Sequence, residues 1–346
     1  MEKTSLKKDQ QITFALSEGA SCITDAGFDN YRFEHIALPE IDFSEIDTSV
    51  KFLGRKLKIP LIISSITGGG SKSEKINRSL AGLSNDYGVG FAVGSQTCAL
   101  KDSSLEKSFR VRPYAPNSLI LANMGAAELN YGFTIDECRR AVDMIDADGL
   151  ILHLNPLHEV FQRNNTTNFS DLLKKIERIC EKLDAPVIVK EVGYGISSSV
   201  AKKLADAGVY AIEVAGAGSI SWSAIEKEAS RDVVLRAAAD SFRGWGNPTT
   251  ECIESIAKSV KNVKIIASGG VNTGVKIAKS IALGADLCGN ASAFLQKIME
   301  SRSECENFME TIMMELKTAM FCTGCKNLEE LKKARIYKNL CHAKHS

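Results

Sequence analysis

The stretch Val263–Ala291, VKIIASGGVNTGVKIAKSIALGADLCGNA, contains two short apolar runs that each end in glycine. The first run, VKIIASGG, leads to Gly269 and Gly270, and the second, ADLCGNA, leads to Gly289. Short β-rich runs that are bounded by Gly, Ser or Asn are typical of buried strands. The pattern therefore predicts two strands whose carboxyl ends open into glycine-containing loops.

Six similar runs precede this stretch, and each ends in Gly, Ser, Asn or Pro. They are PLIISSITGGG, GFAVGSQ, SLILANMG, GLILHLNP, PVIVKEVGYG and VYAIEVAGAG. Helix-like stretches such as Asp171–Leu183 and Val200–Ala207 lie between them. Successive runs mostly begin about 20 to 40 residues apart, as a repeated βα unit requires. Eight such units predict a single (β/α)8 barrel.

The regions outside the runs suggest how the chain is divided. Residues 1–59 are interpreted as a polar N-terminal arm and a preamble to the barrel, and residues 60–346 as the barrel with a C-terminal helical segment. Residues 218–263, between the sixth and seventh runs, are too long for a simple connection. They predict an elaborated loop at the carboxyl ends of the strands, where barrels of this kind carry their active sites.

Composition argues against several classes of function. The 43 basic and 42 acidic residues give a formal net charge of +1, so no overall field attracts nucleic acid or a membrane surface. The N-terminal segment MEKTSLKKDQQ has no apolar core, and no apolar run approaches the roughly 20 residues that span a bilayer. We therefore expect a soluble, cytoplasmic protein that binds neither nucleic acid nor membrane.

The ten cysteines are scattered at irregular intervals, which favours reduced thiols that lie mostly in the core. Cys322 and Cys325 form one CxxC pair, and Cys341, His342 and His345 follow near the end of the chain. A four-ligand zinc site can be built from these residues, but a single CxxC is weak support for one. Metal binding by Cys322 and Cys325 therefore stays open.

A polar cluster follows the run GLILHLNP. His153 and His158 lie within six residues, and Glu159 comes directly after them. Pro156 ends the strand, so the cluster lies at a strand mouth. Three interpretations compete for it: a metal site, an acid/base site, and a loop whose histidines satisfy local hydrogen bonds.

The strand ends also indicate a phosphate-containing ligand. In (β/α)8 barrels a phosphate commonly binds at the loops after strands seven and eight, which here contain Gly269, Gly270 and Gly289. Lys190 ends the buried run PVIVK, where an unpaired charge would be costly. FMN would use both features, because glycine loops fit its phosphate and a cation stabilises its reduced ring. A phosphosugar-binding barrel is the alternative.

Several longer segments resemble the type 2, flavin-dependent isopentenyl diphosphate isomerase family along nearly the whole chain. They include FDNYRFEHIALPEIDFSEIDTS, LGRKLKIPLIISSITGGG, HLNPLHE, PVIVKEVGYGIS and AMFCTGCKNLEEL. The resemblance implies interconversion of isopentenyl and dimethylallyl diphosphate, with reduced FMN as acid/base catalyst, Mg²⁺ on the substrate diphosphate and NADPH as reductant. It also implies a homo-oligomer, a tetramer or octamer, in which the N-terminal arm enters a neighbour's site.

The same resemblance implies a role for each of several residues. His153 and His158 would be catalytic, and Glu159 would bind Mg²⁺, which a lone carboxylate commonly holds together with phosphate oxygens and waters. The substrate would contact Lys7, Lys8, Ser95 and Asn155. The flavin would contact Ser65, Thr67, Asn123, Lys190, Gly269, Gly270, Gly289 and Ala291.

The substrate pocket departs from the family pattern. Gln11 stands where the family has a histidine, Thr97 where it has an arginine, and His158 where it has a glutamine. Threonine cannot grip a phosphate with a planar fork, and histidine adds a group that titrates near neutral pH. Ile66 replaces a methionine, and Ser219 and Ile220 replace a Gly-Thr pair.

Three functions are consistent with this combination of kept and altered residues. The first is a variant isopentenyl diphosphate isomerase in which His158 relays protons and Lys7 and Lys8 hold the diphosphate. The second is an FMN-dependent enzyme of the same ancestry that acts on a different small substrate. The third is a non-catalytic flavin-binding relative.

Overall fold

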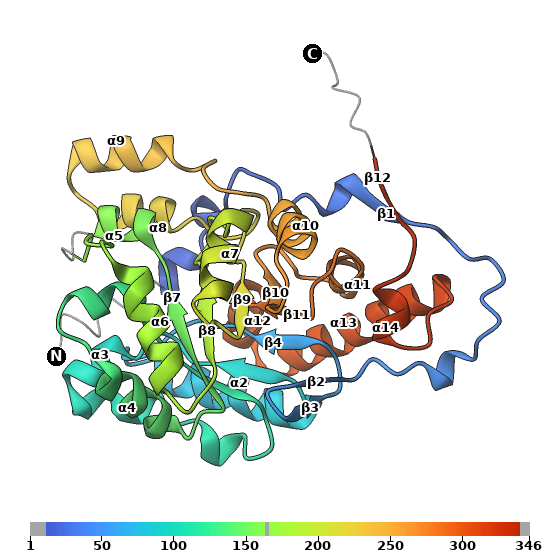
Figure 1. Cartoon of the computed structure of the whole chain (residues 1–346), viewed down its shortest axis with the longest axis horizontal. Coiled ribbons are helices and arrows are strands. Elements are labelled where there is room, and N and C mark those ends of the chain that lie inside the picture. The colour runs from blue at the N-terminus through green and yellow to red at the C-terminus, as the bar shows by residue number, and fades with distance from the viewer. Residues whose placement is uncertain (1–11, 163–165, 340–346) are drawn as a thin grey trace.

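The centre of the fold is a closed barrel of eight parallel strands, with β10-β11-β4-β5-β6-β7-β8-β9 as the order around it. A computed structural model describes residues 12–162 and 166–339, and Figure 1 shows helices surrounding the strands. The barrel strands are β4 (Leu61–Ile63), β5 (Gly90–Ala92), β6 (Ile120–Gly125), β7 (Gly149–His153), β8 (Val187–Lys190), β9 (Ala211–Glu213), β10 (Lys264–Ser268) and β11 (Leu287–Asn290). All eight lie in the predicted runs, so the prediction of a (β/α)8 barrel is confirmed.

Amphipathic helices cover the outside of the barrel. In α6, for example, Leu172, Ile176 and Ile179 recur at helical spacing and are buried. The helices that connect successive strands include α2 (Ser73–Tyr87), α3 (Thr97–Lys101), α4 (Ile135–Ile145), α6 (Leu172–Lys182), α7 (Ser198–Asp206), α10 (Thr249–Ser259) and α11 (Gly274–Ala282), and α12 (Ser292–Glu300) follows β11. Short 3-10 helices are η1 (Glu18–Ala20), η2 (Phe28–Asn30), η3 (Phe43–Glu45), η4 (Ser103–Ser108), η5 (Arg112–Tyr114) and η6 (Ala126–Asn130).

The long connection between β9 and β10 contains two helices before α10, namely α8 (Trp222–Ala229) and α9 (Val233–Ser241). The side chains of Ser221 and Asp232 cap them by accepting backbone N–H groups of the first turn. Helix α8 packs against α5 (Pro156–Gln162), which follows β7, and the two lie together in Figure 1. The elaborated loop predicted after the sixth strand is thus confirmed, and it brings α8 beside the predicted histidine cluster.

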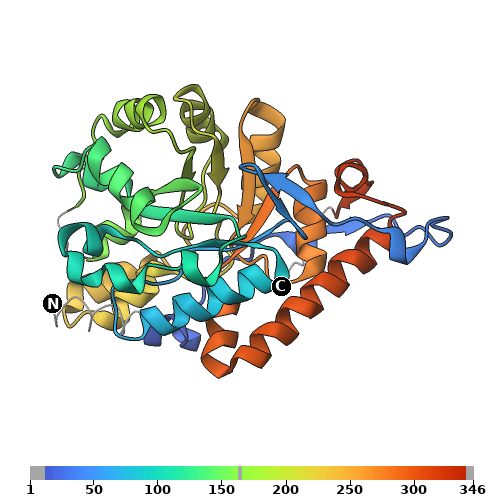
Figure 2. The same ribbon diagram turned by 90° about the horizontal axis from the view of Figure 1, so that it is seen from below.

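An early strand and the last strand of the described chain pair on one side of the barrel. Strand β1 (Tyr31–Phe33) pairs antiparallel with β12 (Ile336–Lys338). The long helix α13 (Arg302–Cys322) packs on α11 and α12, as Figure 2 shows from below, and α14 (Leu328–Leu331) follows it. No strand is predicted from the sequence before residue 60, so β1 and the hairpin of β2 (Val50–Phe52) and β3 (Arg55–Leu57) are additional elements.

The amino-terminal half of the barrel interior is a packed apolar layer. Phe52 and Leu57 of the β2–β3 hairpin cover the amino-terminal end of the barrel and contact this layer. Each strand supplies one buried residue to it, and these are Ile62, Ala92, Leu121, Ile151, Ile188, Ala211, Ile266 and Leu287. Such layers fill the barrel with side chains, so the interior at this level is a core and leaves no pore.

The next layer toward the carboxyl ends is polar. Side chains alternate along a strand, so the residues two positions further on face inward as well. They are Ser64, Gly94, Asn123, His153, Lys190, Glu213, Ser268 and Gly289. The barrel interior therefore changes from hydrocarbon to hydrogen-bonding groups and charges within one layer, at the end where the sequence predicts a site.

Candidate active site

One chain of hydrogen bonds crosses the polar layer from β4 to β7. Asn123 donates from Nδ2 to the hydroxyl of Ser65 at 2.7 Å, and its Oδ1 lies 2.8 Å from Nδ1 of His153. Asn123 is buried, and its own backbone N–H donates to the side chain of Gln96. Three predicted site residues are thus brought together, and their hydrogen-bonding atoms are held in fixed orientations.

A second network contains a buried ion pair. Lys190 ends β8 and lies beside Glu213, which ends β9, in the register of the sheet. The Nζ of Lys190 lies 3.0 Å from Oε1 of Glu213, and the same oxygen accepts a hydrogen bond of 2.8 Å from the Ser64 hydroxyl. The exposed fractions of Lys190 and Glu213 are only 8% and 1%. The cost of burying the lysine is therefore offset by a carboxylate on the neighbouring strand.

His158 lies on α5 and faces α8. Its Nε2 is 2.9 Å from Oε1 of Glu226, and its ring lies 4.6 Å from the ring of Trp222, centre to centre. An ionised carboxylate only accepts hydrogen bonds, so Glu226 in that form requires the proton on Nε2. In the neutral ring Nδ1 then carries the lone pair, and it lies 3.5 Å from Nδ2 of Asn155. In that tautomer Nδ1 of His158 faces the Asn155 amide as a hydrogen-bond acceptor.

Glu159 lies one residue further along α5, in the same cluster. Its Oε1 accepts a 2.7 Å hydrogen bond from Nδ2 of Asn155, and its Oε2 accepts one from the hydroxyl of Thr166. Asn155 thus contacts both His158 and Glu159, and all three side chains are buried. The predicted metal ligand is an oriented carboxylate, which is the donor type that Mg²⁺ prefers.

The glycines after β10 are required by close backbone packing. Gly269 has φ +98°, and a Cβ there would lie 2.1 Å from the carbonyl oxygen of Gly216. Gly270 has φ +76°, and a Cβ there would lie 2.5 Å from the carbonyl oxygen of Gly218. Both positions exclude side chains, so the loops after β9 and β10 are held together at the barrel mouth.

The N-termini of two helices lie next to these loops. Helix α11 begins at Gly274 after β10, and α12 begins at Ser292 after β11, directly after Ala291. The hydroxyls of Ser219 and Ser292 are 3.0 Å apart, so the loop after β9 contacts the start of α12. Helix N-termini with adjacent hydroxyls are a common setting for phosphate groups.

The loop after β8 is held by a buried carboxylate that was not predicted. Oε2 of Glu191 accepts hydrogen bonds of 2.6, 2.7 and 2.6 Å from the backbone N–H groups of Val192, Gly193 and Tyr194. Burial raises the pKa of Glu191 to about 7, although these three bonds act to lower it. The hydroxyl of Tyr194 in turn accepts the N–H of Ser223 at the start of α8.

Other predicted residues have simpler surroundings. The hydroxyls of Ser95 and Thr97 are 3.1 Å apart, and the hydroxyl of Thr67 is 2.9 Å from that of Ser73 on α2. Ile220 pairs with Ser21 of the N-terminal segment in an isolated β-bridge. Lys7, Lys8 and Gln11 lie outside the described residues, so their predicted roles stay predictions.

Among the described residues, the CxxC pair has no further metal ligands beside it. Residues 12–162 and 166–339 contain no group of three or more His, Cys, Asp or Glu side chains that could hold a metal ion. Cys325 is buried, and its thiol contacts Thr323. The other candidate ligands, Cys341, His342 and His345, lie outside the described residues. All nine cysteines within the described residues carry free thiols.

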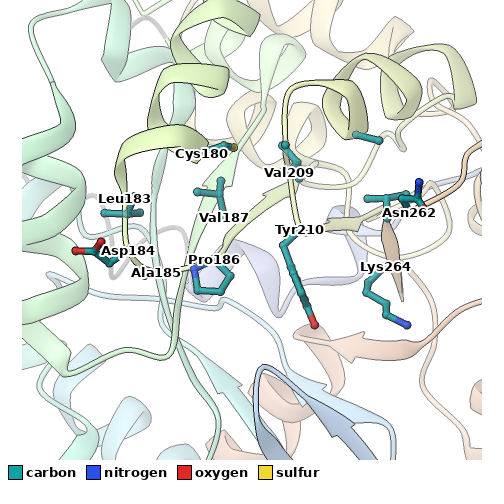
Figure 3. A pocket seen from close by; sticks show the side chains of 13 residues that line it. Cys180, Leu183, Asp184, Ala185, Pro186, Val187, Val209, Tyr210, Asn262 and Lys264 are labelled. Carbon is teal, nitrogen blue, oxygen red and sulfur yellow. The ribbon is translucent and has the colours of Figure 1, made fainter.

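A cavity of about 620 Å³ lies at the amino-terminal end of the barrel, and Figure 3 shows the side chains that line it. It is lined by Cys180 of α6, Ala205 of α7 and the residues that lead into β8, β9 and β10, including Tyr210 and Lys264. Tyr210 packs edge-on against Phe52 of the β2–β3 hairpin. No predicted site residue lines this cavity, so it is separate from the polar layer.

Three carboxylates of the site are absent from the sequence predictions, namely Glu191, Glu213 and Glu226. A signal for Glu213 exists, because it ends the apolar run VYAIE as Lys190 ends PVIVK, and a buried charge at a strand end needs a partner. Glu226 lies within a helix of the long loop and does not end an apolar run, so the sequence does not mark it as a site residue in this way.

The geometry agrees with relationships found by comparison with known proteins. The sequence model of a family described as FMN-dependent dehydrogenase matches residues 154–338. The chain is 46% identical over 331 residues to the isopentenyl-diphosphate delta-isomerase of a Nostoc species, covering 95% of each chain. It is 43% identical over 334 residues to the enzyme of that name from Oceanobacillus iheyensis, covering 96% of each. The chain belongs to the isopentenyl-diphosphate delta-isomerase family.

Solved structures of lower sequence identity show the fold. A solved structure of mandelate oxidase with (S)-2-phenylpropionate superposes with a TM-score of 0.67 at 15% identity, covering 97% of each chain. The structure with benzoyl-formic acid gives a TM-score of 0.66 at 14% identity, again covering 97% of each. At this identity the similarity supports the barrel and its connections and carries no information on substrate.

Proposed function

We propose that this protein is an FMN-dependent isomerase that interconverts isopentenyl and dimethylallyl diphosphate. The observation that carries the proposal is the polar layer at the carboxyl ends of the strands, in which Lys190 and Asn123 are buried, His153 is partly buried, and all three are held by polar contacts. The 46% identity to a relative of that name over 95% of both chains supports the choice of reaction. When bound, reduced FMN would supply acid/base chemistry, and His158 would relay protons.

The residues of the barrel mouth fit a flavin by the chemistry of their donors. Lys190 would place a cation against the electron-rich edge of the ring. Asn123, Ser65 and Thr67 would offer amide and hydroxyl groups to the polar atoms of the ring. Gly269, Gly270 and Ala291 lie next to the N-termini of α11 and α12, which would hold the phosphate.

Gly289 has a different explanation from the one that the family resemblance implies. A Cβ at Gly289 would lie 2.3 Å from the hydroxyl of Ser64 and 3.1 Å from Oε1 of Glu213. The absence of a side chain there makes room for the network around Lys190. Contact of Gly289 with the flavin stays a prediction.

The cluster on α5 would act on the substrate. Glu159 would hold Mg²⁺ together with diphosphate oxygens and waters. His158 would accept a proton at Nδ1 while Glu226 holds the opposite side of the ring at 2.9 Å, an arrangement that fixes the orientation and tautomer of a histidine base. Lys7 and Lys8 would hold the diphosphate, and NADPH would reduce the flavin. Assembly into a homo-oligomer and a cytoplasmic location are further parts of the proposal.

One observation favours the second candidate, a flavin enzyme of the same family with a different substrate. The hydroxyl of Thr97 lies 3.1 Å from that of Ser95, so this position offers hydroxyls where the family pattern has a guanidinium. A charge-assisted hydrogen bond contributes about 1.5 to 3 kcal/mol, and its loss would weaken the hold on a diphosphate. A less phosphorylated substrate would not need that arginine.

The flavin is tested by purifying the protein with FMN and titrating it with NADPH under anaerobic conditions. We expect a yellow protein with one FMN per chain whose visible absorption bleaches on reduction. A protein that binds no flavin at micromolar FMN would exclude both the isomerase and the alternative flavin enzyme.

The metal ligand is tested by Glu159→Gln. We expect this change to abolish activation of the reduced enzyme by Mg²⁺ while FMN binding persists, because the amide has no negative charge to offer the metal. Glu181→Gln, on the exposed face of α6, serves as the matched control and should keep the metal dependence. Normal Mg²⁺ activation in the Glu159→Gln variant would contradict the assignment.

A further inference from the structure

Glu213 is the charged member of the polar layer to which the proposed function gives no role. It is 1% exposed and ends β9 in the centre of the barrel. Its Oε1 forms an ion pair with Nζ of Lys190 at 3.0 Å and accepts a hydrogen bond of 2.8 Å from the hydroxyl of Ser64. The carboxylate is therefore bound to the same cation that would face the flavin ring.

The position of Lys190 depends on Glu213. A lysine side chain has several rotatable bonds, and in this structure Nζ has two partners: the carboxylate of Glu213 on the neighbouring strand β9, and the backbone carbonyl of Glu191, the next residue in the chain, at 3.0 Å. The carbonyl alone would leave the charge uncompensated in a buried site, which is costly. Glu213 thus fixes where the positive charge lies.

Glu213 also changes how strongly that charge acts. In a buried site of low dielectric, one unit charge affects another group over several ångströms. Lys190 alone would strongly favour a negative charge on a reduced ring, whereas the ion pair has no net charge. A carboxylate 3.0 Å from Nζ therefore offsets part of the field that the ring would experience.

We propose that Glu213 is a positioning and charge-balancing residue for the flavin: it fixes Nζ of Lys190 and offsets part of its charge, so that the reduced ring can exchange a proton instead of being held as an anion. This inference rests on the proposed function, because it requires a flavin at the barrel mouth. It explains why the Lys190–Glu213 ion pair is buried at a position where a neutral hydrogen-bond donor would be enough to bind the flavin.

The experiment compares the FMN midpoint potential and the spectrum of the dithionite-reduced flavin in wild type and Glu213→Gln. Glutamine keeps an oxygen for the contacts with Lys190 and Ser64 and removes the charge. We expect the preference for reduced over oxidised FMN to increase at least tenfold, which is a potential about 30 mV higher for a two-electron couple. The reduced spectrum should shift toward the anionic form at a pH where wild type shows the neutral form.

Two further variants separate charge from hydrogen bonding. Ser64→Ala removes the hydrogen bond to Oε1 of Glu213 without a change of charge. The preference of this variant for reduced over oxidised FMN should stay within threefold of the wild-type value. Lys190→Met should shift the potential in the opposite direction from Glu213→Gln, and the double variant should fall between the two. A Glu213→Gln protein with bound FMN, an unchanged potential and an unchanged reduced spectrum would overturn the proposal.

The test remains decisive if Glu213→Gln alone fails to bind FMN. The double variant Lys190→Met/Glu213→Gln should then bind FMN at least tenfold more tightly than Lys190→Met, because it no longer buries an unpaired carboxylate. Equal or weaker binding would overturn the inference. None of these readouts needs an isoprenoid substrate, so a shifted potential in a protein without isomerase activity would contradict the proposed function alone. Isomerase activity with an unchanged potential would contradict this inference alone.

Discussion

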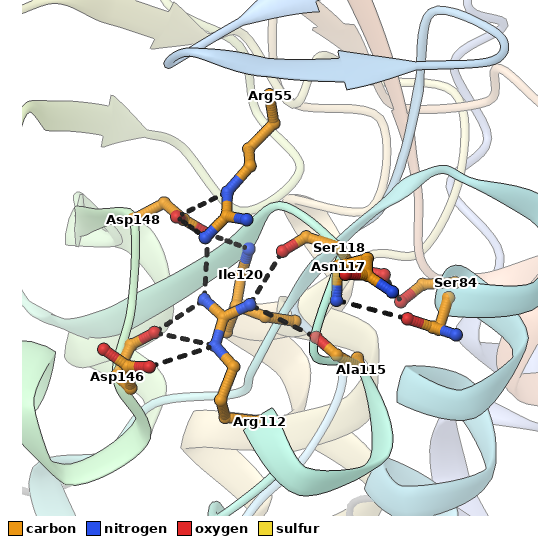
Figure 4. Close-up of polar contacts among 10 residues, drawn as sticks. Arg55, Ser84, Arg112, Ala115, Asn117, Ser118, Ile120, Asp146 and Asp148 are labelled. Atoms are coloured by element: carbon orange, nitrogen blue, oxygen red, sulfur yellow. Dashed lines mark hydrogen bonds and ion pairs between the residues drawn. The ribbon is translucent and has the colours of Figure 1, made fainter.

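The two ends of the barrel treat paired charges in different ways. At the amino-terminal end, Asp148 accepts hydrogen bonds from Arg55, Arg112 and the backbone N–H of Ile120, as Figure 4 shows. Arg112 is fully engaged there as well, because it also donates to the carbonyls of Asp146, Ala115 and Ser118. The partners of this network are all supplied by the fold itself.

At the carboxyl-terminal end the charges are paired but sit beside hydroxyls, amides and glycine loops. Lys190 pairs with Glu213, and His158 pairs with Glu226, each within the mouth of the barrel. In (β/α)8 enzymes the amino end serves stability and the carboxyl end serves chemistry. An ion pair alone therefore does not show whether its residues serve stability or chemistry. Its position along the strands indicates which of the two roles it has.

The largest expected effect is a loss of stability when Asp148 at the amino-terminal end is replaced. Asp148→Ala leaves the guanidinium groups of Arg55 and Arg112 without their common acceptor. Removing one partner of a buried pair costs about 3 to 5 kcal/mol. Asp148 and Arg112 are 14% and 15% exposed and Arg55 is 39% exposed, so we expect a loss at the lower end of that range in the free energy of unfolding, measured by urea denaturation. The midpoint potential of bound FMN should not change.

Asp146→Asn is the matched control for this prediction. The side chain of Asp146 is 86% exposed, and asparagine tolerates its positive φ of 50°, so its stability should stay within about 0.5 kcal/mol of wild type. A large shift of the flavin potential in Asp148→Ala would show that the amino end is coupled to the site, which would end the division between the two ends.

At the carboxyl-terminal end, Glu191 should make the stability of the protein depend on pH. Burial raises the pKa of this carboxyl from its ordinary 4.5 to about 7 in the folded protein. Between these values the folded state keeps a proton that the unfolded state has lost, so stability falls as the pH rises from about 4.5 to about 7. The loss for this one group is about 3 kcal/mol at 1.36 kcal/mol per pKa unit.

Glu191→Gln provides the measurement for this prediction. The amide resembles the protonated carboxyl and does not titrate, so the excess stability of wild type over the variant should fall across that pH range and stay level above it. The free energy of unfolding of both proteins, measured from about pH 5 to pH 8, checks the expectation. A difference that is constant with pH, or one that grows as the pH rises, would show that the carboxylate is ionised in the folded state.

Much of the fold could be predicted from the sequence because parallel strands buried on both faces form short, continuous apolar runs. The run VKIIASGG contains β10 and the run GLILHLNP contains β7. The hairpin of β2 and β3 was missed because its strands have three residues each and carry charged residues such as Lys51 and Lys56. Short edge elements of this kind depend on the barrel against which they pack.

Site residues could be predicted from the sequence where they lie at the end of a strand. They could not be predicted where their role depends on a contact with a residue distant in the sequence. Asn123, His153 and Lys190 were found because each ends or follows a buried run. Glu226 was missed because its partner His158 is 68 residues away in the sequence, and no local pattern records that α8 packs on α5. Whether Ser95 and Asn155 contact a substrate stays a prediction, since their roles depend on a molecule and not on the fold.

The most direct measurement is turnover of isopentenyl diphosphate by the FMN-loaded protein, reduced with NADPH in the presence of Mg²⁺ and analysed for dimethylallyl diphosphate. We predict conversion that depends on the reduced flavin and that consumes no NADPH beyond the amount needed to reduce it, because the reaction has no net oxidation. A protein that carries fully reduced FMN and Mg²⁺ and forms no dimethylallyl diphosphate would contradict the proposal that the carboxyl end of this barrel is an isomerase site.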